Sequence, residues 1–330
     1  FARVATNGRI AITTHSYYGP REDMVSVLDV GRRSPTDTGT WRAIWGPADV
    51  ALEGFRGFVT ADGGLYAVDL VDPANPVELS FLDLNESEHL AVDSGRAYVA
   101  TMSAGGFPSV DVIDVSNPSD MIERGRHAWE RGGPDPRAVD ATGDIAVVAD
   151  LGGLRVLDVS VPFDVRQTAR LERYGSTAVA LVGNHAVVGY SSPTAPDERG
   201  FIVVDLTNGE NPTAVGEWSS PSGVTAVVEF GGAVLVGTRA DGVYMFNLDD
   251  PSRPIEVDRW ALPGRAAVTD LAAVWPKVVV THGSLGCTVL AFDVSCGLPR
   301  RPSRRVSPSN VNTRYESLAS DPPGSAVPPS

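Results

Sequence analysis

The sequence predicts an all-β protein, a seven-bladed β-propeller with four antiparallel strands in each blade. The first observation is a repeat: a short apolar segment ending in Asp or Asn returns every 40 to 47 residues, the length of one propeller blade. The second is that strand-length apolar runs and turn residues, without helical periodicity, fill the intervals. We call the residues that end the repeated segments the anchors: Asp29, Asp69, Asp114, Asp158, Asp205, Asn247 and Asp293.

Each repeat contains four elements in a fixed order, which the third repeat illustrates. Two apolar runs, 90–92 and 97–100, flank a tight turn at 93–96 that contains hairpin-type residues. A Gly-rich connection leads into the anchor strand, which ends at Asp114. A turn rich in Asp, Asn, Ser and Pro follows, because proline cannot continue a β-ladder. A more polar run, 122–129, then completes a four-stranded unit of the kind found in propellers.

The repeats predict one propeller domain, 1–318, and a Pro- and Ser-rich tail, 319–330. The last unit lacks an obvious fourth strand, and 311–315 is the best candidate because its residues alternate in polarity. The predicted blades are 1–46, 47–84, 85–131, 132–173, 174–220, 221–263 and 264–318.

Composition excludes some partners. The chain has 330 residues, with 27 Lys and Arg against 41 Asp and Glu, a formal net charge of −14 and a pI near 4.7. Nucleic-acid binding needs a basic face, so no nucleic-acid partner is predicted. No uninterrupted apolar run reaches the roughly 18 residues of a membrane helix, so no membrane span is predicted either. Cys287 and Cys296 would lie about 30 Å apart on a straight strand, which predicts no disulfide between them.

The anchor segments and the turns after them closely resemble the repeat of the LVIVD-repeat family of bacterial and archaeal surface proteins. Residues 66–76, 110–118 and 154–160 carry the resemblance best, while 31–33 and 295–297 depart from the usual acidic, Pro-containing turn. The resemblance covers about residues 1–300 and implies a secreted or surface-attached seven-bladed propeller. The family has no common activity, so the resemblance implies no catalytic residues.

The N-terminus supports the same location. The chain begins with Phe1 instead of Met, which fits either removal of a secretory signal peptide or a sequence that starts at an internal boundary, and we expect the former. We therefore expect a secreted, periplasmic or cell-surface protein.

Candidate site residues gather where strand one begins and strand two ends, because these ends lie side by side at the mouth of a propeller channel. At the start of strand one the seven units place Arg3, Asp49, His89, Arg137, Ala178, Thr225 and Asp270. Five of these seven are ionisable, although the residues that follow them are mostly apolar. With the corresponding ends of strand two, the predicted ligand-binding residues are Arg3, Asp49, His89, Arg137, Asp150, Tyr190, Arg239, Asp270 and His282.

This set has two interpretations. It could bind a carboxylated or sugar-like ligand, or supply an acid–base pair for a lyase or hydrolase, for which the candidates are Asp49, His89, Asp270 and His282. Alternatively, a propeller mouth is polar because it faces water, and Arg and Asp side chains pair with each other across it. No cofactor or metal site is predicted. A divalent metal on His89, His282 and Asp270 is the weaker alternative, because these residues lack ligand spacing.

No strong catalytic motif is present: the sequence lacks His-Glu-x-x-His, Cys-x-x-Cys, Gly-x-Ser-x-Gly and a phosphate-binding loop. We therefore predict a secreted or surface-located binding module for a protein or a small polar ligand at the propeller face. The alternative is an enzyme with an acid–base site at the channel mouth. Geometry separates the two, since an enzyme needs an acid and a base that converge on one point, whereas a scaffold shows mutually paired charges.

The tryptophans have a structural explanation. Those near the ends of the fourth strands are expected to pack the blades: Trp45, Trp129, Trp218 and Trp260. Trp41 and Trp275 fall outside this column and are expected to be more exposed.

Overall fold

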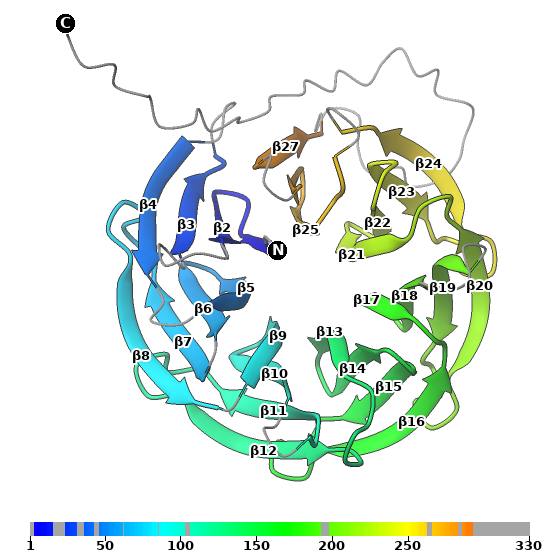
Figure 1. Ribbon diagram of the computed structural model, residues 1–330, viewed down its shortest axis with the longest axis horizontal. Coiled ribbons are helices and arrows are strands. Elements are labelled where there is room, and N and C mark those ends of the chain that lie inside the picture. The colour runs from blue at the N-terminus through cyan, green and yellow to red at the C-terminus, as the bar shows by residue number, and fades with distance from the viewer. Residues whose placement is uncertain are drawn as a thin grey trace, which may run out of the picture.

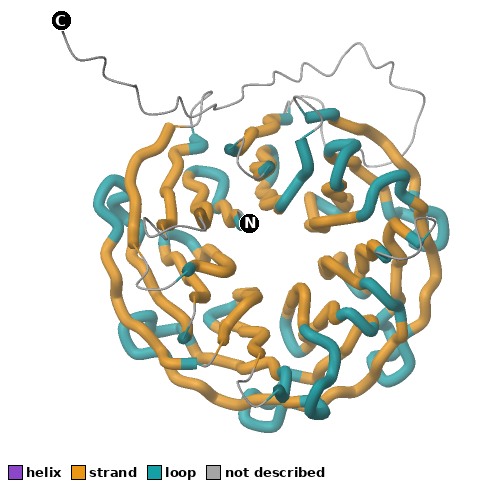
Figure 2. The backbone as a smooth tube through the Cα atoms, in the orientation of Figure 1, coloured by secondary structure: helices purple, strands orange, loops and turns teal. Residues whose placement is uncertain are grey.

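The computed structural model describes residues 3–15, 24–31, 36–42, 46–61, 63–84, 86–102, 106–192, 198–262, 266–282 and 286–292. These residues form seven antiparallel sheets around one central axis, as Figure 1 shows. The regular structure in this part of the chain is all β-strand, joined by turns and loops (Figure 2). The prediction of a seven-bladed β-propeller is confirmed.

Within each sheet the strands follow chain order, and the first strand lies nearest the axis (Figure 1). Blades 1 to 3 contain β1 (Val4–Thr6), β2 (Ile10–His15), β3 (Met24–Asp29) and β4 (Thr36–Arg42); β5 (Pro47–Glu53), β6 (Arg56–Ala61), β7 (Gly64–Asp69) and β8 (Val77–Asp83); and β9 (Glu86–Asp93), β10 (Arg96–Met102), β11 (Ser109–Asp114) and β12 (Ile122–Ala128). Blades 4 to 6 contain β13 (Pro136–Thr142), β14 (Ile145–Asp150), β15 (Gly153–Asp158) and β16 (Arg166–Glu172); β17 (Ser176–Val182), β18 (His185–Ser191), β19 (Arg199–Asp205) and β20 (Thr213–Ser219); and β21 (Val224–Phe230), β22 (Ala233–Thr238), β23 (Val243–Asn247) and β24 (Ile255–Trp260).

The seventh blade has three described strands: β25 (Asp270–Val274), β26 (Lys277–Thr281) and β27 (Cys287–Ala291). The predicted outer strand at 311–315, the anchor Asp293 and the tail 319–330 lie outside the described residues. No helix in the part of the chain that is described is long and apolar enough to cross a membrane.

The anchor residues end the third strand of a blade with a side-chain hydrogen bond. Asp69 Oδ1 accepts a bond of 2.8 Å from the N–H of Val71, and Asp158 Oδ1 accepts one of 2.9 Å from the N–H of Ser160. Four other anchors accept the same bond from the amide two residues ahead: Asp29, Asp114, Asp205 and Asn247. This is the Asx-turn, in which a short polar side chain replaces part of a backbone turn. The repeated Asp therefore marks the point where strand three stops.

The turn after an anchor packs against the outer strand of the preceding blade. A Cβ on Gly125 of β12 would lie 2.1 Å from the carbonyl oxygen of Pro162, which belongs to the next blade. Two further pairs show the same approach, Gly39 with Pro73 at 2.2 Å and Gly216 with Pro251 at 2.1 Å. In these three blades a Cβ at the glycine would overlap the carbonyl as it is placed here.

Tryptophans fill the outer part of the interfaces between blades, which confirms the prediction for Trp129, Trp218 and Trp260, while Trp45 lies outside the described residues. Trp41 pairs in register with β3, as Trp218 and Trp260 do with β19 and β23. The prediction that Trp41 is exposed is wrong, because it is 8% exposed and meets Tyr66 edge-on at 5.1 Å. Trp275 is half-buried and packs in the core cluster of blades 6 and 7. The turns differ in length between blades. Trp41 therefore did not align with the other tryptophans when the repeats were compared from their C-terminal ends.

Blades 1 and 7 join to close the ring. The N–H of Val4 donates to Asp270 Oδ2 at 2.9 Å. Lys277, the single lysine of the sequence, donates from Nζ to the carbonyl oxygen of Gly8 at 3.3 Å and to that of Val30. An apolar cluster from both blades lies behind these bonds: Val4, Ala11, Leu28, Val30, Ala272, Val279 and Cys287.

Candidate functional site

A cavity of about 390 Å³ lies at the centre of the ring and is lined by the innermost strands of all seven blades. Four of the nine predicted ligand-binding residues line it: Arg3, Asp49, His89 and Asp270. Arg3, Asp49 and His89 belong to blades 1, 2 and 3, and Asp270 belongs to blade 7. These four blades are consecutive around the ring. The structure therefore brings together the residues from one side of the predicted mouth.

Arg3 is the centre of this group. Its Nη2 lies 3.2 Å from His89 Nδ1, and its Nη1 lies 3.9 Å from Asp270 Oδ1. His89 Nδ1 lies 3.7 Å from Asp49 Oδ2, while His89 Nε2 lies 3.8 Å from Glu88 Oε2. The cationic and anionic side chains are thus paired with one another.

The two aspartates also bond the free edges of neighbouring innermost strands. Asp49 accepts from its neighbour Val50 N at 2.9 Å and from Leu90 N of the next blade at 3.2 Å. Asp270 bonds Val4 N across the seam between blades 7 and 1. An edge strand in a channel has amides without a ladder partner, and unbonded buried amides are costly. Both carboxylates therefore stabilise contacts between blades.

A third carboxylate does the same deeper in the cavity. Asp140 Oδ1 accepts from Ala141 N at 2.9 Å, and its Oδ2 accepts from Leu181 N of the next blade at 2.8 Å. Burial raises the pKa of Asp140 to about 6, and the charges of Asp93 and Glu229 add to the effect, although the two amides oppose it.

Burial and a shared arginine separate the acidities of the other two aspartates. Burial raises the pKa of Asp270 to about 6, with Arg3 opposing and the charge of Asp49 adding. Burial also acts upward on Asp49, but Arg3 and His89 outweigh it and hold its pKa below the usual value. Burial acts to lower the pKa of Arg3, but the charges of Asp49, Asp270 and Glu88 raise it, so the guanidinium stays charged. The pKa values of Asp49 and Asp270 are therefore shifted in opposite directions.

Arg137 is not among the residues that line the cavity. Strand β13 shifts its register between Pro136 and Ala138, as β5, β17 and β21 do at the same point, so Ala138 and not Arg137 occupies the position that Asp49 has in β5. Arg137 instead lies with Nη2 3.9 Å from Asp135 Oδ2.

The predicted residues from the ends of strand two also lie away from the cavity lining. Asp150 is fully buried, and its Oδ2 accepts a bond of 2.6 Å from Arg155 Nε within blade 4. Tyr190 packs beneath the guanidinium of Arg173, whose carbon lies 3.8 Å from the ring centre. These contacts are parts of the blade interior.

The last two predicted residues are Arg239 and His282. Arg239 is exposed, and its amide donates to the carbonyl of Gly223 at 3.0 Å. His282 is buried with Nε2 2.9 Å from Thr288 Oγ1, and burial lowers its pKa. Within the described ranges no group of three or more His, Cys, Asp or Glu side chains could hold a metal ion.

The arrangement in the cavity differs from an acid–base pair. Such a pair needs groups that are free to take and give a proton at one substrate atom. The carboxylate oxygens of Asp49 and Asp270 instead contact amides, the imidazole or the guanidinium of Arg3.

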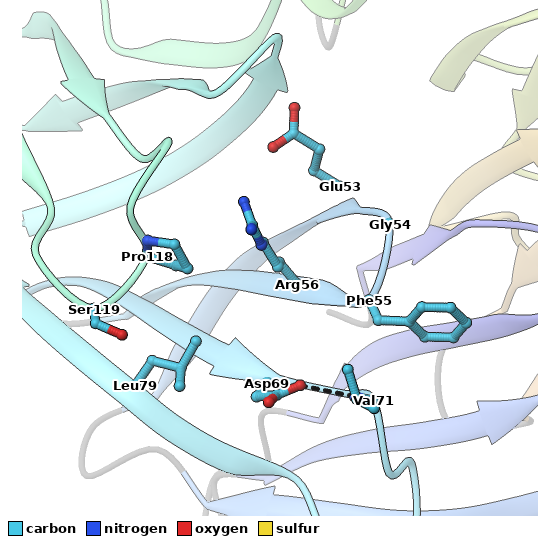
Figure 3. Close-up of a pocket in the computed structure, with 9 residues that line it drawn as sticks. All are labelled: Glu53, Gly54, Phe55, Arg56, Asp69, Val71, Leu79, Pro118 and Ser119. Carbon is cyan, nitrogen blue, oxygen red and sulfur yellow. Dashed lines mark hydrogen bonds between the residues drawn. The ribbon is translucent and has the colours of Figure 1, made fainter.

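A second hollow opens between blades 2 and 3, and the sequence did not indicate it. This groove has a volume of about 710 Å³. Its walls come from the turn between β5 and β6, the end of β7, strand β8, and the turn after β11 (Figure 3). The lining residues are Glu53, Gly54, Phe55, Arg56, Asp69, Val71, Leu79, Pro118 and Ser119.

Some polar groups of the groove already form hydrogen bonds within the protein. Asp69 bonds Val71 N through Oδ1, the dashed line in Figure 3, and Glu53 accepts from Gly95 N through Oε1 at 2.9 Å. Arg56 Nη1 donates to the carbonyl of Ser116 in blade 3 at 3.4 Å. Each carboxylate keeps a second oxygen as an acceptor.

The aligned repeats contain a signal for this groove. Val71 occupies the position after the anchor where blades 3, 4 and 5 have Ser116, Ser160 and Thr207. It is 73% exposed, which is unusual for an apolar residue that bonds only through its backbone. An apolar residue at a turn position that is polar in blades 3 to 6 would have identified this wall.

The groove belongs to a face with a marked charge. We define the acidic face as the end of the propeller that carries the turns after strand three. In blades 2 to 6 each of these turns contains two acidic residues, and only the last also contains a basic residue, Arg253. The turns are 69–76, 114–121, 158–165, 205–212 and 247–254.

Comparison with known families gives one match. A family model described as the LVIVD repeat matches residues 87–128 and 135–163, which span blade 3 and the first three strands of blade 4. The resemblance seen in the sequence is thereby confirmed. No curated protein matches the chain.

Solved structures similar to this chain include three propellers. BamB from Moraxella catarrhalis is 14% identical, with 87% of this chain and 81% of that chain covered and a TM-score of 0.57. The computationally designed Ika8 protein is 16% identical, with 88% and 83% covered and a TM-score of 0.62. A chain of a Mitotic Checkpoint Complex is 12% identical, with 86% and 83% covered and a TM-score of 0.64. Similarity at such identities shows the fold alone.

Proposed function

We propose that this chain, a seven-bladed propeller built of LVIVD repeats, is a non-catalytic module that binds a protein partner outside the cytoplasm. The observation that carries the proposal is the contrast between the two hollows. The ionisable residues of the central cavity are bonded to each other and to neighbouring blades. The groove on the acidic face is open, and one of its apolar lining residues, Val71, is 73% exposed.

Exposed apolar side chains support the docking role of this face. Val71 is 73% exposed and Phe163, in the corresponding turn of blade 4, is 80% exposed. Val161 of the same turn is 40% exposed. Exposed apolar side chains that gather on one face favour a surface that binds another protein, although single ones also occur elsewhere, as at Tyr174.

The location outside the cytoplasm is supported by the LVIVD repeat, since the sequence resembles surface proteins of that family. Fractionation of the source cells tests it. Recovery of the protein in the cytoplasmic fraction alone would contradict this part of the proposal.

Site-specific photo-crosslinking tests the binding role. A photoreactive amino acid replaces Val71 in the groove or, as a control, Tyr174, which is 61% exposed and lies in a loop at the opposite end of the propeller. In an extract of the source organism we expect one defined protein adduct from position 71 and none of that mass from position 174. The same adduct from both positions, or none from either, would contradict a docking role for the groove.

The cavity supports a second candidate, a small polar ligand, because Arg3 and the edge amides of the inner strands border about 390 Å³ of space. Thermal unfolding with sugars, carboxylates and divalent metals tests it. A ligand at about a hundred times its Kd stabilises by about 2.7 kcal/mol, and a cavity ligand would lose this effect in a His89→Ala, Asp270→Ala variant. No shift with any of them would leave the groove as the binding site.

A further inference from the structure

We infer that the partner segment recognised in the groove is cationic and carries one apolar side chain, an Arg- or Lys-rich stretch with a Leu-like anchor. This inference rests on the proposed binding function and adds the chemistry of the partner. It follows from the charge of the acidic face, the walls of the groove and the bonding of the lining residues.

Charge selects a cationic partner. The acidic face repeats a two-acid turn in five consecutive blades, within a chain of net charge −14, and of these ten acids Asp114 pairs with Arg124 and Asp164 with Arg166. Two of these turns, 69–76 and 114–121, form the sides of the groove. The summed field of such a face attracts basic segments and accelerates their encounter.

The lining itself offers more acceptors than donors. Asp69 and Glu53 each use one oxygen for a backbone amide and keep the other available. The single cation that lines the groove, Arg56, already donates to the carbonyl of Ser116. Guanidinium and ammonium groups of a partner would form charge-assisted bonds with the remaining oxygens.

The apolar residues that line the groove favour a partner segment with one apolar side chain. Val71 of blade 2 is 73% exposed and Leu79 of the same blade is half-buried, whereas Pro118 of blade 3 is buried, so the open apolar surface of the groove comes mainly from blade 2 (Figure 3). A buried apolar side chain at the centre of a polar rim is the common form of an interaction hot spot. A purely cationic segment would leave these walls in water.

Fluorescence anisotropy with labelled peptides tests the inference on the full chain. The probe is Arg-Arg-Ser-Leu-Ser-Arg-Arg. One matched peptide has Ser in place of Leu, and the other has Glu in place of every Arg. We expect the Leu peptide to bind at least fivefold more tightly than the Ser peptide, and the Glu peptide not to bind. Added salt should weaken binding of the Leu peptide.

The chain offers matched variants. Asp69→Asn removes one groove charge but keeps an oxygen for Val71 N, and Asp205→Asn makes the same change at the anchor of blade 5, outside the groove. Val71→Ser removes an apolar wall, and Tyr174→Ser removes an exposed apolar ring elsewhere. We expect Asp69→Asn and Val71→Ser to weaken binding about fivefold or more, and the two controls to change it less than twofold. Thermal unfolding confirms that each variant is folded.

Three outcomes would overturn the inference. Equal affinity for the Leu and Ser peptides would show attraction by charge alone. Equal losses in Asp69→Asn and Asp205→Asn would show a diffuse field without a groove site. Much tighter binding after replacement of Arg300, Arg301, Arg304 and Arg305 by Gln would show that the groove binds the chain's own basic segment, which would contradict a partner as its occupant.

The two proposals can fail separately. If position 71 crosslinks a protein but the Leu peptide does not bind, the partner has a different chemistry and the binding function stands. If position 71 gives no adduct and the peptide does not bind, both are wrong.

Discussion

The structural role of an aspartate in this propeller depends on the groups that its two carboxylate oxygens contact. At the anchors a carboxylate oxygen accepts a turn amide at the surface, as in Asp158 with Ser160. In the cavity a carboxylate bonds amides of adjacent blades, as in Asp49 and Asp140. The residue type is the same, but burial differs, so the acidities should differ as well.

The first prediction concerns these acidities. Hydrogen bonds from Ser116 and Arg124 lower the pKa of Asp114 to about 2, while burial raises those of Asp140 and Asp270 to about 6. Carboxyl ¹³C chemical shifts of labelled aspartates, assigned with Asp→Asn variants, should show these separate midpoints. Titration of Asp140 and Asp270 with the exposed aspartates, near pH 3.9, would contradict their burial.

These shifts have opposite consequences for stability. Asp140 and Asp270 bind protons more tightly in the folded than in the unfolded chain, so their contribution is full below pH 3.8 and is lost as pH rises through about 6. Asp114 binds its proton more weakly when folded, so its contribution is present above pH 3.8 and is lost as pH falls toward about 2.

At the scale of elements, the turns after the anchors fix the spacing of the blades. The carbonyls of Pro73, Pro162 and Pro251 each approach a glycine on the outer strand of the preceding blade. In blade 2 a serine takes this place, and Ser80 Oγ donates to the carbonyl of Pro118 at 2.6 Å. The turn therefore ends the third strand of its own blade and also packs against the outer strand of the preceding blade.

The second prediction tests this contact. Gly125→Ala should lower the free energy of unfolding by about 1–3 kcal/mol, because the added Cβ meets the carbonyl of Pro162. Gly209→Ala is the control, since nothing lies within 4 Å of a Cβ there, and it should change stability by less than about 0.5 kcal/mol. Urea unfolding measures both. Equal effects would contradict the close approach.

The elements of the fold could be predicted from the sequence, but side-chain direction could not be predicted everywhere. Anchors such as Asp158 are visible because each repeat ends its third strand with the same chemistry. The placement of Arg137 failed because the innermost strands share a one-residue register shift, and the sequence alignment matched Arg137 at the shift with Asp49, whose true counterpart is Ala138. A side chain changes face with each residue, so an undetected shift moves it out of the site.

At the scale of the whole molecule, ring closure joins segments that are more than 240 residues apart in sequence, as Lys277 and Val30 are. No repeat pattern predicts this contact, because it involves a residue type that occurs once in the chain. The groove between blades 2 and 3 was missed for a related reason. It depends on features of single blades, such as Val71, instead of on the features that the blades share.

The third prediction concerns the seam. Lys277→Met keeps the apolar stem but removes the donors to Gly8 and Val30, and should lower the free energy of unfolding by about 2 kcal/mol. Arg253→Met, an exposed cation of the acidic face, should change it by less than about 0.5 kcal/mol. Urea unfolding compares the two variants, and equal effects would show that the lysine does not hold the seam.

Hydrogen–deuterium exchange with and without the Arg-Arg-Ser-Leu-Ser-Arg-Arg peptide tests most directly where this propeller binds. The structure predicts slower exchange on binding in the turns 53–56, 69–76 and 114–121, which surround the groove. The innermost strands, including β5, β9 and β13, should be unchanged, since the charges of the cavity serve to bond the blades. Protection of those strands without protection of the turns would place the binding site in the channel and contradict the account.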